Sequence, residues 1–262
     1  MTKTNAPQPR SAAKAIKPVD AATLIIVDAA AGEPRILMGQ RRKDLVFMPG
    51  KYVFPGGRVD KPDHDVACCA DLPAREIDRL LIDMKGTPSA GRARALALAA
   101  LRETFEETGL LIGGAGKAPA TEPSVATATA VAASEPGRSW QSFRAHGLLP
   151  RLDQMTFFAR AITPPGRSRR YDTRFFCVDA AAISHDCESR DDELLSLHWL
   201  TLDETRAFDL ASITRIILED LAERLDRGSV STTNLPVPYY YFQNGSFHRR
   251  LIAAWQAPNN AW

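Results

Sequence analysis

Cysteine and histidine are scarce in this chain, which has four cysteines and five histidines among 262 residues. The cysteines are too few for a disulfide-stabilised scaffold and lack the paired spacing of a zinc finger, so we expect reduced core thiols at Cys68, Cys69, Cys177 and Cys187. The histidines lie far apart, and we interpret each as a structural or surface residue.

The sequence also lacks a strong excess of one charge and a long hydrophobic run. Thirty-three basic residues face 31 acidic ones, and this net charge of +2 argues against a nucleic-acid-binding protein. The apolar run 21–31 contains Asp28 and is too short to span a bilayer, so we expect no membrane segment. Three prolines within residues 1–20 disfavour an amphipathic targeting helix, which predicts a flexible arm on a cytoplasmic protein.

An acidic cluster is the most informative feature that is present. The segment 102–109 reads Arg-Glu-Thr-Phe-Glu-Glu-Thr-Gly, and on a helix Glu103, Glu106 and Glu107 would be neighbours. Three adjacent carboxylates raise one another's proton affinity unless a cation compensates them. The pattern therefore predicts a divalent-metal site, and a solvated acidic helix that ends at Gly109 is the simpler alternative.

A glycine turn lies upstream, in the segment 52–60, which reads Tyr-Val-Phe-Pro-Gly-Gly-Arg-Val-Asp. Together with the acidic cluster, this turn resembles the Nudix box of the Nudix hydrolases, a loop-helix-loop that binds Mg²⁺ or Mn²⁺ and a substrate diphosphate. The resemblance implies that Arg102 orients the acids and that the metal ligands are Gly57, Glu103, Glu106 and Glu107.

The box is split by an insertion. In an uninterrupted box the arginine stands fourteen positions after the first glycine, which is position 71 here, whereas Arg102 lies 31 residues further on. Counting back eight positions from Arg102, to the place of the first box glutamate, gives Arg94. We therefore expect the acid partner at the helix start to be missing or supplied from elsewhere. Thr104 replaces the usual aliphatic residue.

A split box of this kind resembles the branch that includes the mammalian coenzyme A diphosphatases. This resemblance implies hydrolysis of the diphosphate bond in a nucleoside diphosphate linked to a group X, with coenzyme A or acyl-coenzyme A as the first candidate. An ADP-ribose or dinucleotide pyrophosphatase and a catalytically silent nucleotide sensor are the alternatives. The partner is thus a small-molecule nucleotide diphosphate, with no nucleic acid and no membrane involved.

The candidate site residues fall into two groups besides the metal ligands. The catalytic candidates are Glu106, Glu107, Arg102 and Glu193, of which the last is an acid on a late loop before Trp199. The candidates for binding the substrate phosphates are cations, because guanidinium groups fit phosphate oxygens well; they are Arg41, Arg42, Lys51, Arg58 and Arg174.

The fold expected from the resemblance is an α/β class protein, a Nudix α/β/α sandwich with a mixed β-sheet and an inserted helical element. Hydrophobic periodicity predicts strands over 23–27, 35–39, 51–54, 155–162, 174–178 and 194–200, and helices over 74–84, 90–108 and 213–225. We expect a flexible arm at 1–20, a Nudix domain at 21–228, an insertion at about 61–91, a flexible loop at about 113–139 and a C-terminal extension at 229–262. That extension is expected to pack on the domain or on the second subunit of a homodimer.

Overall fold

The computed structural model describes residues 16–30, 32–116, 137–187, 192–228 and 235–252. Most of the expected N-terminal arm, the middle of the expected loop at 113–139 and parts of the C-terminal extension lie outside these ranges. Within them, no helix is both long and apolar enough to cross a membrane.

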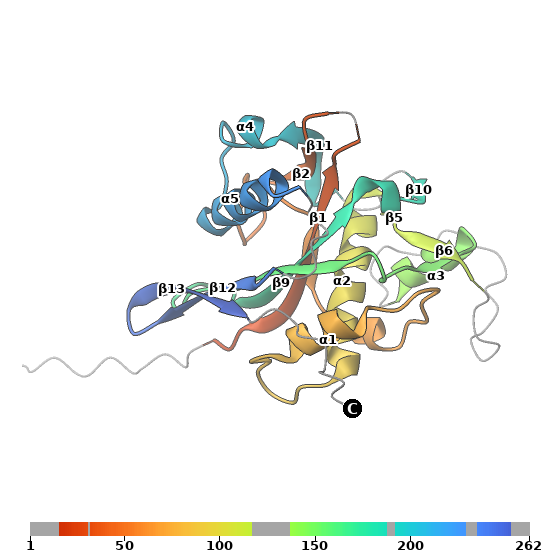
Figure 1. Cartoon of the computed structure of the whole chain (residues 1–262), viewed down its shortest axis with the longest axis horizontal. Coiled ribbons are helices and arrows are strands. Elements are labelled where there is room, and N and C mark those ends of the chain that lie inside the picture. The colour runs from red at the N-terminus through yellow and green to blue at the C-terminus, as the bar shows by residue number, and fades with distance from the viewer. Residues whose placement is uncertain (1–15, 31, 117–136, 188–191, 229–234, 253–262) are drawn as a thin grey trace, which may run out of the picture.

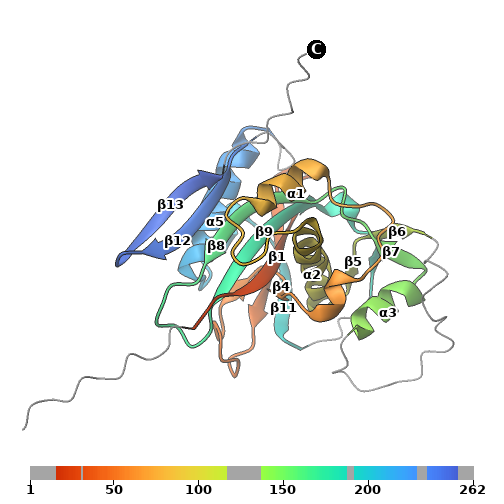
Figure 2. The ribbon, with the colours of Figure 1, turned by 90° about the horizontal axis from the view of Figure 1, so that it is seen from below.

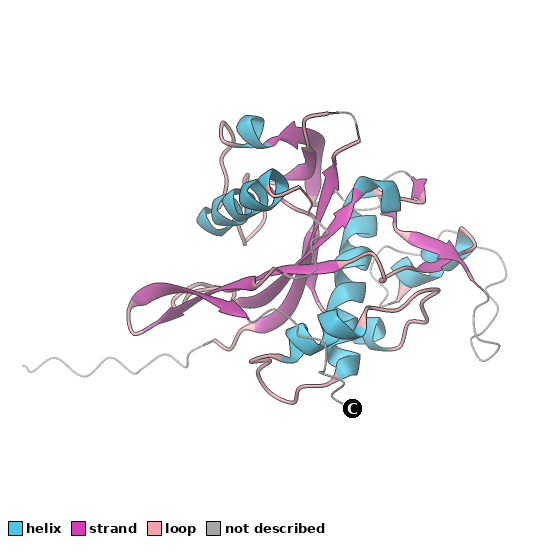
Figure 3. Ribbon diagram, viewed as in Figure 1, coloured by secondary structure: helices cyan, strands magenta, loops and turns pink. Residues whose placement is uncertain are grey.

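A mixed sheet of nine strands organises the described part of the chain (Figure 3). The strand order is β11-β2-β1-β9-β8-β12-β13, with β3 paired to β2 and β4 paired to β1. The pairs β1–β9 and β8–β12 are parallel and the others antiparallel. These strands are β1 (Val19–Asp28), β2 (Arg35–Arg41), β3 (Tyr52–Val53), β4 (Gly56–Arg58), β8 (Thr156–Ile162), β9 (Tyr171–Asp179), β11 (Leu194–Thr201), β12 (Val237–Gln243) and β13 (Ser246–Ile252).

Helices cover both faces of this sheet (Figures 1 and 2). One face carries α1 (Ala74–Leu81) and α2 (Ala90–Thr108), with α3 (Arg138–Ala145) packed beside α2, and the other carries α4 (Leu202–Thr205) and α5 (Ser212–Asp226). Successive residues of the central strand β1 serve the two cores alternately: Leu24 and Ile26 pack on the α2 side, and Ile25 and Val27 on the α5 side. The expected α/β/α sandwich is confirmed.

The helix α2 begins and ends where local sequence predicts. Ser89 caps its first turn by accepting a hydrogen bond from the Arg92 N–H, and Gly109 follows its last residue in the left-handed conformation, with φ of 79°. Buried alanines at 93, 95, 97, 99 and 100 let the helix pack closely on β1. The 310 turn η1 (Lys61–His64) and α1 precede it, so the insertion supplies the expected helical element.

Two regions are more structured than the sequence predicts. The tail is expected to pack on the domain or on a second subunit, and its described part forms the hairpin β12–β13, which continues the main sheet and buries Tyr239 and Tyr240. The ends of the loop expected at 113–139 are ordered, as β6 (Gly113–Ala115) and α3. Around them lie β5 (Leu110–Leu111), β7 (Leu148–Pro150), β10 (His185–Asp186) and η2 (Ala180–Ala182).

A buried cluster of charges joins β1, β8 and β9. Asp172 accepts hydrogen bonds from Arg160 at 2.8 and 2.7 Å and forms an ion pair with Arg174 at 3.0 Å. Arg174 also donates to Asp20 at 3.1 Å. Removing one member of such a group leaves the remaining charges buried and uncompensated.

We therefore expect Asp172→Asn to lower the free energy of unfolding by about 3 kcal/mol, measured by urea denaturation. The matched control is Asp153→Asn, because Asp153 pairs with Arg151 at 2.9 Å on the surface, where such pairs contribute about 1 kcal/mol at most. Equal losses in both variants would contradict a special role for the buried cluster.

Candidate active site

The glycine turn and the acidic helix meet directly. The Gly56 N–H donates a hydrogen bond to Glu107 Oε2 at 2.9 Å. A Cβ atom added to Gly57 would lie 2.4 Å from Glu103 Cδ, so a larger residue there would displace the Glu103 carboxylate. Glu103 and Glu107 are thus held against the turn, as the metal-site prediction requires.

Arg102 holds two of the acids from the side. Its Nη1 donates to Glu103 Oε1 at 2.9 Å and to Glu106 Oε2 at 3.0 Å. Ser139 of α3 donates to the other oxygen of Glu106. The arginine is buried, and its Nη2 also donates to the Arg58 carbonyl at 2.9 Å. Arg102 therefore fixes the acids relative to each other and to the end of β4.

Asp63 is a further site residue, and sequence reasoning missed it. It is fully buried in η1 and accepts hydrogen bonds from Arg102 Nε at 2.9 Å and from Arg102 Nη2 at 3.1 Å. Trp140 Nε1 also donates to it, at 2.9 Å. The acid partner is therefore supplied from elsewhere, from before the insertion, and Arg94 itself pairs with Asp71 at 3.0 Å.

A sequence signal for Asp63 existed. The first box glutamate stands six positions after the first glycine, and counting six positions forward from Gly57 reaches Asp63. Counting backward from Arg102 crosses the insertion and reaches Arg94 instead. The insertion therefore begins after Asp63 and ends before Arg102.

Burial and mutual repulsion make this cluster costly to ionise. Burial raises the pKa of Glu103 to about 7, although the neighbouring Arg102 opposes the shift. Burial and the Glu103 charge also raise the pKa of Glu107 well above its usual range, against the Gly56 hydrogen bond. Burial alone lowers the pKa of Arg102, but its bond to Asp63 and the charges of Glu103, Asp63 and Glu106 outweigh this and raise it. A further cation at the carboxylates would relieve the repulsion that remains.

Glu193 lies close enough to this cluster to act on it. Its charge contributes to the raised pKa of both Glu103 and Glu107. Arg41 Nη2 pairs with Glu193 Oε1 at 2.6 Å, and the same arginine donates to the Phe47 carbonyl at 3.1 Å. The late acid predicted from the sequence thus lies at the edge of the site, although it follows the end of α2 by more than eighty residues.

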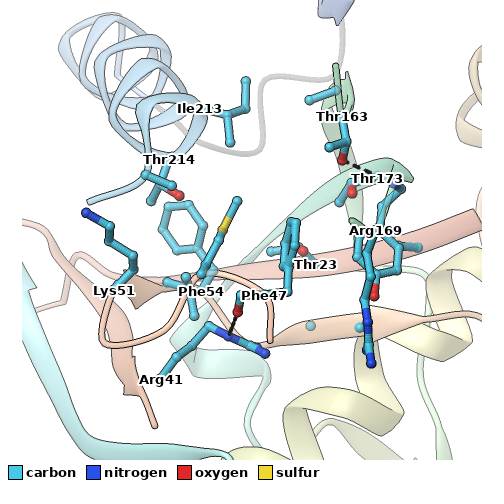
Figure 4. Close-up of a pocket in the computed structure, with 18 of the residues that line it drawn as sticks. Thr23, Arg41, Phe47, Lys51, Phe54, Thr163, Arg169, Thr173, Ile213 and Thr214 are labelled. Carbon is cyan, nitrogen blue, oxygen red and sulfur yellow. Dashed lines mark hydrogen bonds between the residues drawn. The ribbon is translucent and has the colours of Figure 1, made fainter. Parts of the chain in front are cut away.

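A large cavity opens from the carboxylates onto the α5 face of the sheet, with a volume of about 1040 Å³. Gly57, Glu103 and Glu193 line one part of it, and alternate residues of β9, namely Tyr171, Thr173 and Phe175, form its floor. Figure 4 shows Arg41 and Lys51 on one side of the cavity and Arg169 on the other. Apolar lining comes from Phe47, Met48, Phe54, Ile213, Ile216 and Phe247.

The cations predicted to bind substrate divide into two groups. Arg41, Lys51 and Arg58 line the cavity, and so do Arg167 and Arg169, which were not among the candidates. Arg42 does not line it, and its side chain pairs with Asp44 at 2.6 Å. Arg174 is fully buried in the cluster with Asp20 and Asp172, so its expected contact with substrate is corrected to a structural role.

The donor atoms at the turn suit a hard divalent cation. Glu103 lies against Gly57 and Glu107 accepts from the Gly56 N–H, whereas Glu106 bonds Arg102 and Ser139. Mg²⁺ and Mn²⁺ prefer such carboxylate oxygens as donors. The Glu103 carboxylate can lie against Gly57 only because the glycine has no side chain. The residues present therefore fit the expected metal.

Because Asp63 is the buried counter-charge of Arg102, we expect Asp63→Asn to lower the free energy of unfolding by about 3 kcal/mol. The matched control is Asp65→Asn, in the same turn of the chain but exposed. Chemical denaturation of the two variants measures the difference. A loss below about 1 kcal/mol for Asp63→Asn, within the range of an exposed pair, would show that Arg102 does not depend on Asp63.

Comparison with known proteins agrees with this geometry. No family model matches the chain. The acyl-coenzyme A diphosphatase NUDT19 of Gallus gallus is 29% identical over 178 residues, an alignment that covers 54% of this chain and 47% of that protein. The chain thus spans about half the length of the curated relative it matches.

The fold is shared with a solved structure. The crystal structure of a Nudix hydrolase from Alicyclobacillus acidocaldarius superposes with a TM-score of 0.54 at 24% sequence identity. The match covers 78% of this chain and 90% of the other. The architecture described above is therefore the Nudix fold.

Proposed function

We propose that the chain is a member of the Nudix family and a metal-dependent hydrolase of the diphosphate bond in a nucleoside diphosphate linked to a group X. One observation carries the proposal. The box acids Glu103 and Glu107 converge on the Gly56–Gly57 turn at the end of a large cavity that cations line. A catalytically silent sensor has no need to keep two buried or half-buried carboxylates against this turn.

The metal ligands in this proposal are the Gly57 backbone and the side chains of Glu103, Glu106 and Glu107. A bound Mg²⁺ or Mn²⁺ supplies charge neutralisation at the phosphate oxygens and a more acidic bound water. Arg102 fixes the orientation of Glu103 and Glu106 through its two Nη1 hydrogen bonds. Glu193 is the candidate late acid for accepting a proton from the attacking water, held at the cavity edge by Arg41.

Substrate phosphates are proposed to contact Arg41, Lys51 and Arg58, which line the cavity around the turn. Arg58 is the most available of the three, with 68% of its side chain exposed and one ion pair, to Asp60. Lys51 pairs with Asp209 at 2.5 Å, so it would exchange that partner for a phosphate oxygen. Such exchange is inexpensive at a half-exposed pair.

We propose coenzyme A or an acyl-coenzyme A as the substrate class. The relative NUDT19 is named as an acyl-coenzyme A diphosphatase. The cavity of about 1040 Å³ is at the upper end of the range usual for small-molecule sites, which suits a large conjugate with an apolar part. Coenzyme A also carries a 3′-phosphate besides the diphosphate, and Arg167 and Arg169, between β8 and β9, provide further cations in the cavity lining.

A substrate panel tests the proposal. Coenzyme A, dephospho-coenzyme A and ADP-ribose are incubated with the protein and Mg²⁺ or Mn²⁺, and products are identified by mass. We expect 3′,5′-ADP and phosphopantetheine from coenzyme A. Glu106→Gln should reduce turnover by a factor on the order of 100, because it removes a ligand charge. The control is Glu219→Gln, since Glu219 is exposed on α5.

The panel distinguishes the alternatives. Hydrolysis of ADP-ribose alone would favour an ADP-ribose or dinucleotide pyrophosphatase. Tight nucleotide binding without hydrolysis of any compound would identify a silent sensor. Unchanged turnover in Glu106→Gln at saturating Mg²⁺ would contradict the assignment of the metal ligands.

A further experiment tests the role of Arg167 and Arg169. We expect the double variant Arg167→Ala, Arg169→Ala to raise KM for coenzyme A about tenfold, the loss of one charge-assisted hydrogen bond, and to leave KM for dephospho-coenzyme A nearly unchanged. The control is Arg215→Ala, at an exposed position of α5. Equal changes in KM for both compounds would mean that these arginines do not recognise the 3′-phosphate.

A further inference from the structure

A second group of metal-ligating side chains lies outside the cavity. His146, His185 and Cys187 each present one ligand atom, and these atoms all lie within 4.8 Å of one another. His146 Nε2 is 3.3 Å from Cys187 Sγ, and the two imidazole rings have centroids 5.5 Å apart. None of the three lines the cavity.

Separate elements bring these residues together. His185 pairs with Leu111 in the β5–β10 ladder, and the Cys187 N–H continues it by donating to the Gly109 carbonyl at 3.1 Å. Residues two apart on an extended strand point to the same side, so the side chains of His185 and Cys187 share a face. His146 follows the last residue of α3, and Figure 1 places α3, β5 and β10 together on the side away from α5.

A second observation concerns the orientation of His146. Its Nδ1 lies 2.8 Å from the Ser142 carbonyl, and since a carbonyl only accepts hydrogen bonds, Nδ1 carries the proton. Nε2 is then the nitrogen with a free lone pair, and it faces Cys187. Metal-ligating histidines usually donate their other ring N–H to a carbonyl or carboxylate in this way, which fixes the tautomer before the metal binds.

From this geometry we propose that His146, His185 and Cys187 form a binding site for a transition-metal cation of the Zn²⁺ type. One thiolate and two imidazoles are the donors that such cations prefer, whereas Mg²⁺ prefers oxygen. With usual zinc–sulfur and zinc–nitrogen bond lengths, a tetrahedral site separates sulfur and nitrogen by about 3.5 Å. The observed 3.3 Å needs little adjustment.

The exposure of the group fits an ion that enters from solvent. His146 and His185 are exposed and Cys187 is half-buried, so three protein ligands leave a fourth position for water. The site would join the end of α3 to the segment after β10, whose Cys187 N–H is hydrogen-bonded to Gly109, the residue that follows α2. Its occupancy would therefore brace α2 at the end nearest Glu107.

The test uses the full-length chain, freed of metal and kept reduced, and titrates it with Co²⁺ as a spectroscopic substitute for Zn²⁺. We expect a thiolate-to-Co²⁺ charge-transfer band that saturates at one equivalent and disappears when Zn²⁺ is added. Cys187→Ser and His185→Gln should lose the band. Cys69→Ser should keep it, because Cys69 is an exposed thiol elsewhere. Carboxylate ligands give no such band, so the result is independent of the proposed hydrolase site.

Stability provides a second readout. Zn²⁺ should raise the thermal midpoint of the wild type and of Cys69→Ser, since a ligand that binds only the folded state stabilises it. The shift should be lost in Cys187→Ser, whose circular dichroism without metal checks that it is folded. A wild type without the thiolate band, or a Cys187→Ser variant that keeps it, would overturn the proposal.

Discussion

The buried guanidinium of Arg102 is the interaction on which the site depends. It bonds Asp63, Glu103 and Glu106 at once, and it also holds the carbonyl of Arg58 at the end of the glycine turn. A cluster of carboxylates in a buried place repels itself, and a fixed cation is needed to keep it compact. The site is therefore shaped before any metal binds, and Glu107, held by the Gly56 N–H, completes it.

The same interaction explains how the box tolerates an insertion. Asp63 and Arg102 touch, so the inserted chain leaves and returns at one place and does not separate the parts of the box. The insertion also contributes to the fold through α1. Its buried Glu76 accepts a hydrogen bond from the Phe157 N–H at 3.0 Å, and Arg79 pairs with Glu76 and donates to the Leu235 carbonyl. The inserted helix thus ties β8 to the start of the C-terminal hairpin.

What could be read from the sequence was local and periodic. The helix 90–108 has a capping serine before it and a glycine after it, which mark its two ends. The continuous apolar run 23–27 predicts a strand that is mostly buried, and the structure shows one. The three box acids were found because helical spacing alone brings them together. Glu193 was placed by its position before Trp199, although only the pairing of β11 with β2 brings it beside Arg41.

The features that were missed depend on pairing between distant segments. Arg174 is predicted to bind substrate phosphates, but the parallel pairing of β1 with β9 buries it and brings Asp20 within reach of it. The hairpin of the tail joins the sheet through β8, which no local pattern of the tail specifies. The group at His146, His185 and Cys187 has no metal-ligand spacing in the sequence, because His146 follows α3 while His185 and Cys187 lie in and after β10.

The two sides of the cavity are built from different kinds of segment. The carboxylates and the glycine turn are fixed by α2 and β4, whose contacts are buried and leave little freedom for change. The opposite side is built from residues 163–169, which connect β8 to β9, and from the start of α5. Connecting segments tolerate substitution far better than buried helices. Under the proposed function, the end that would bind the diphosphate can therefore stay constant while changes at Arg167 or Arg169 alter which group X is accepted, and substrate choice would then depend on that side.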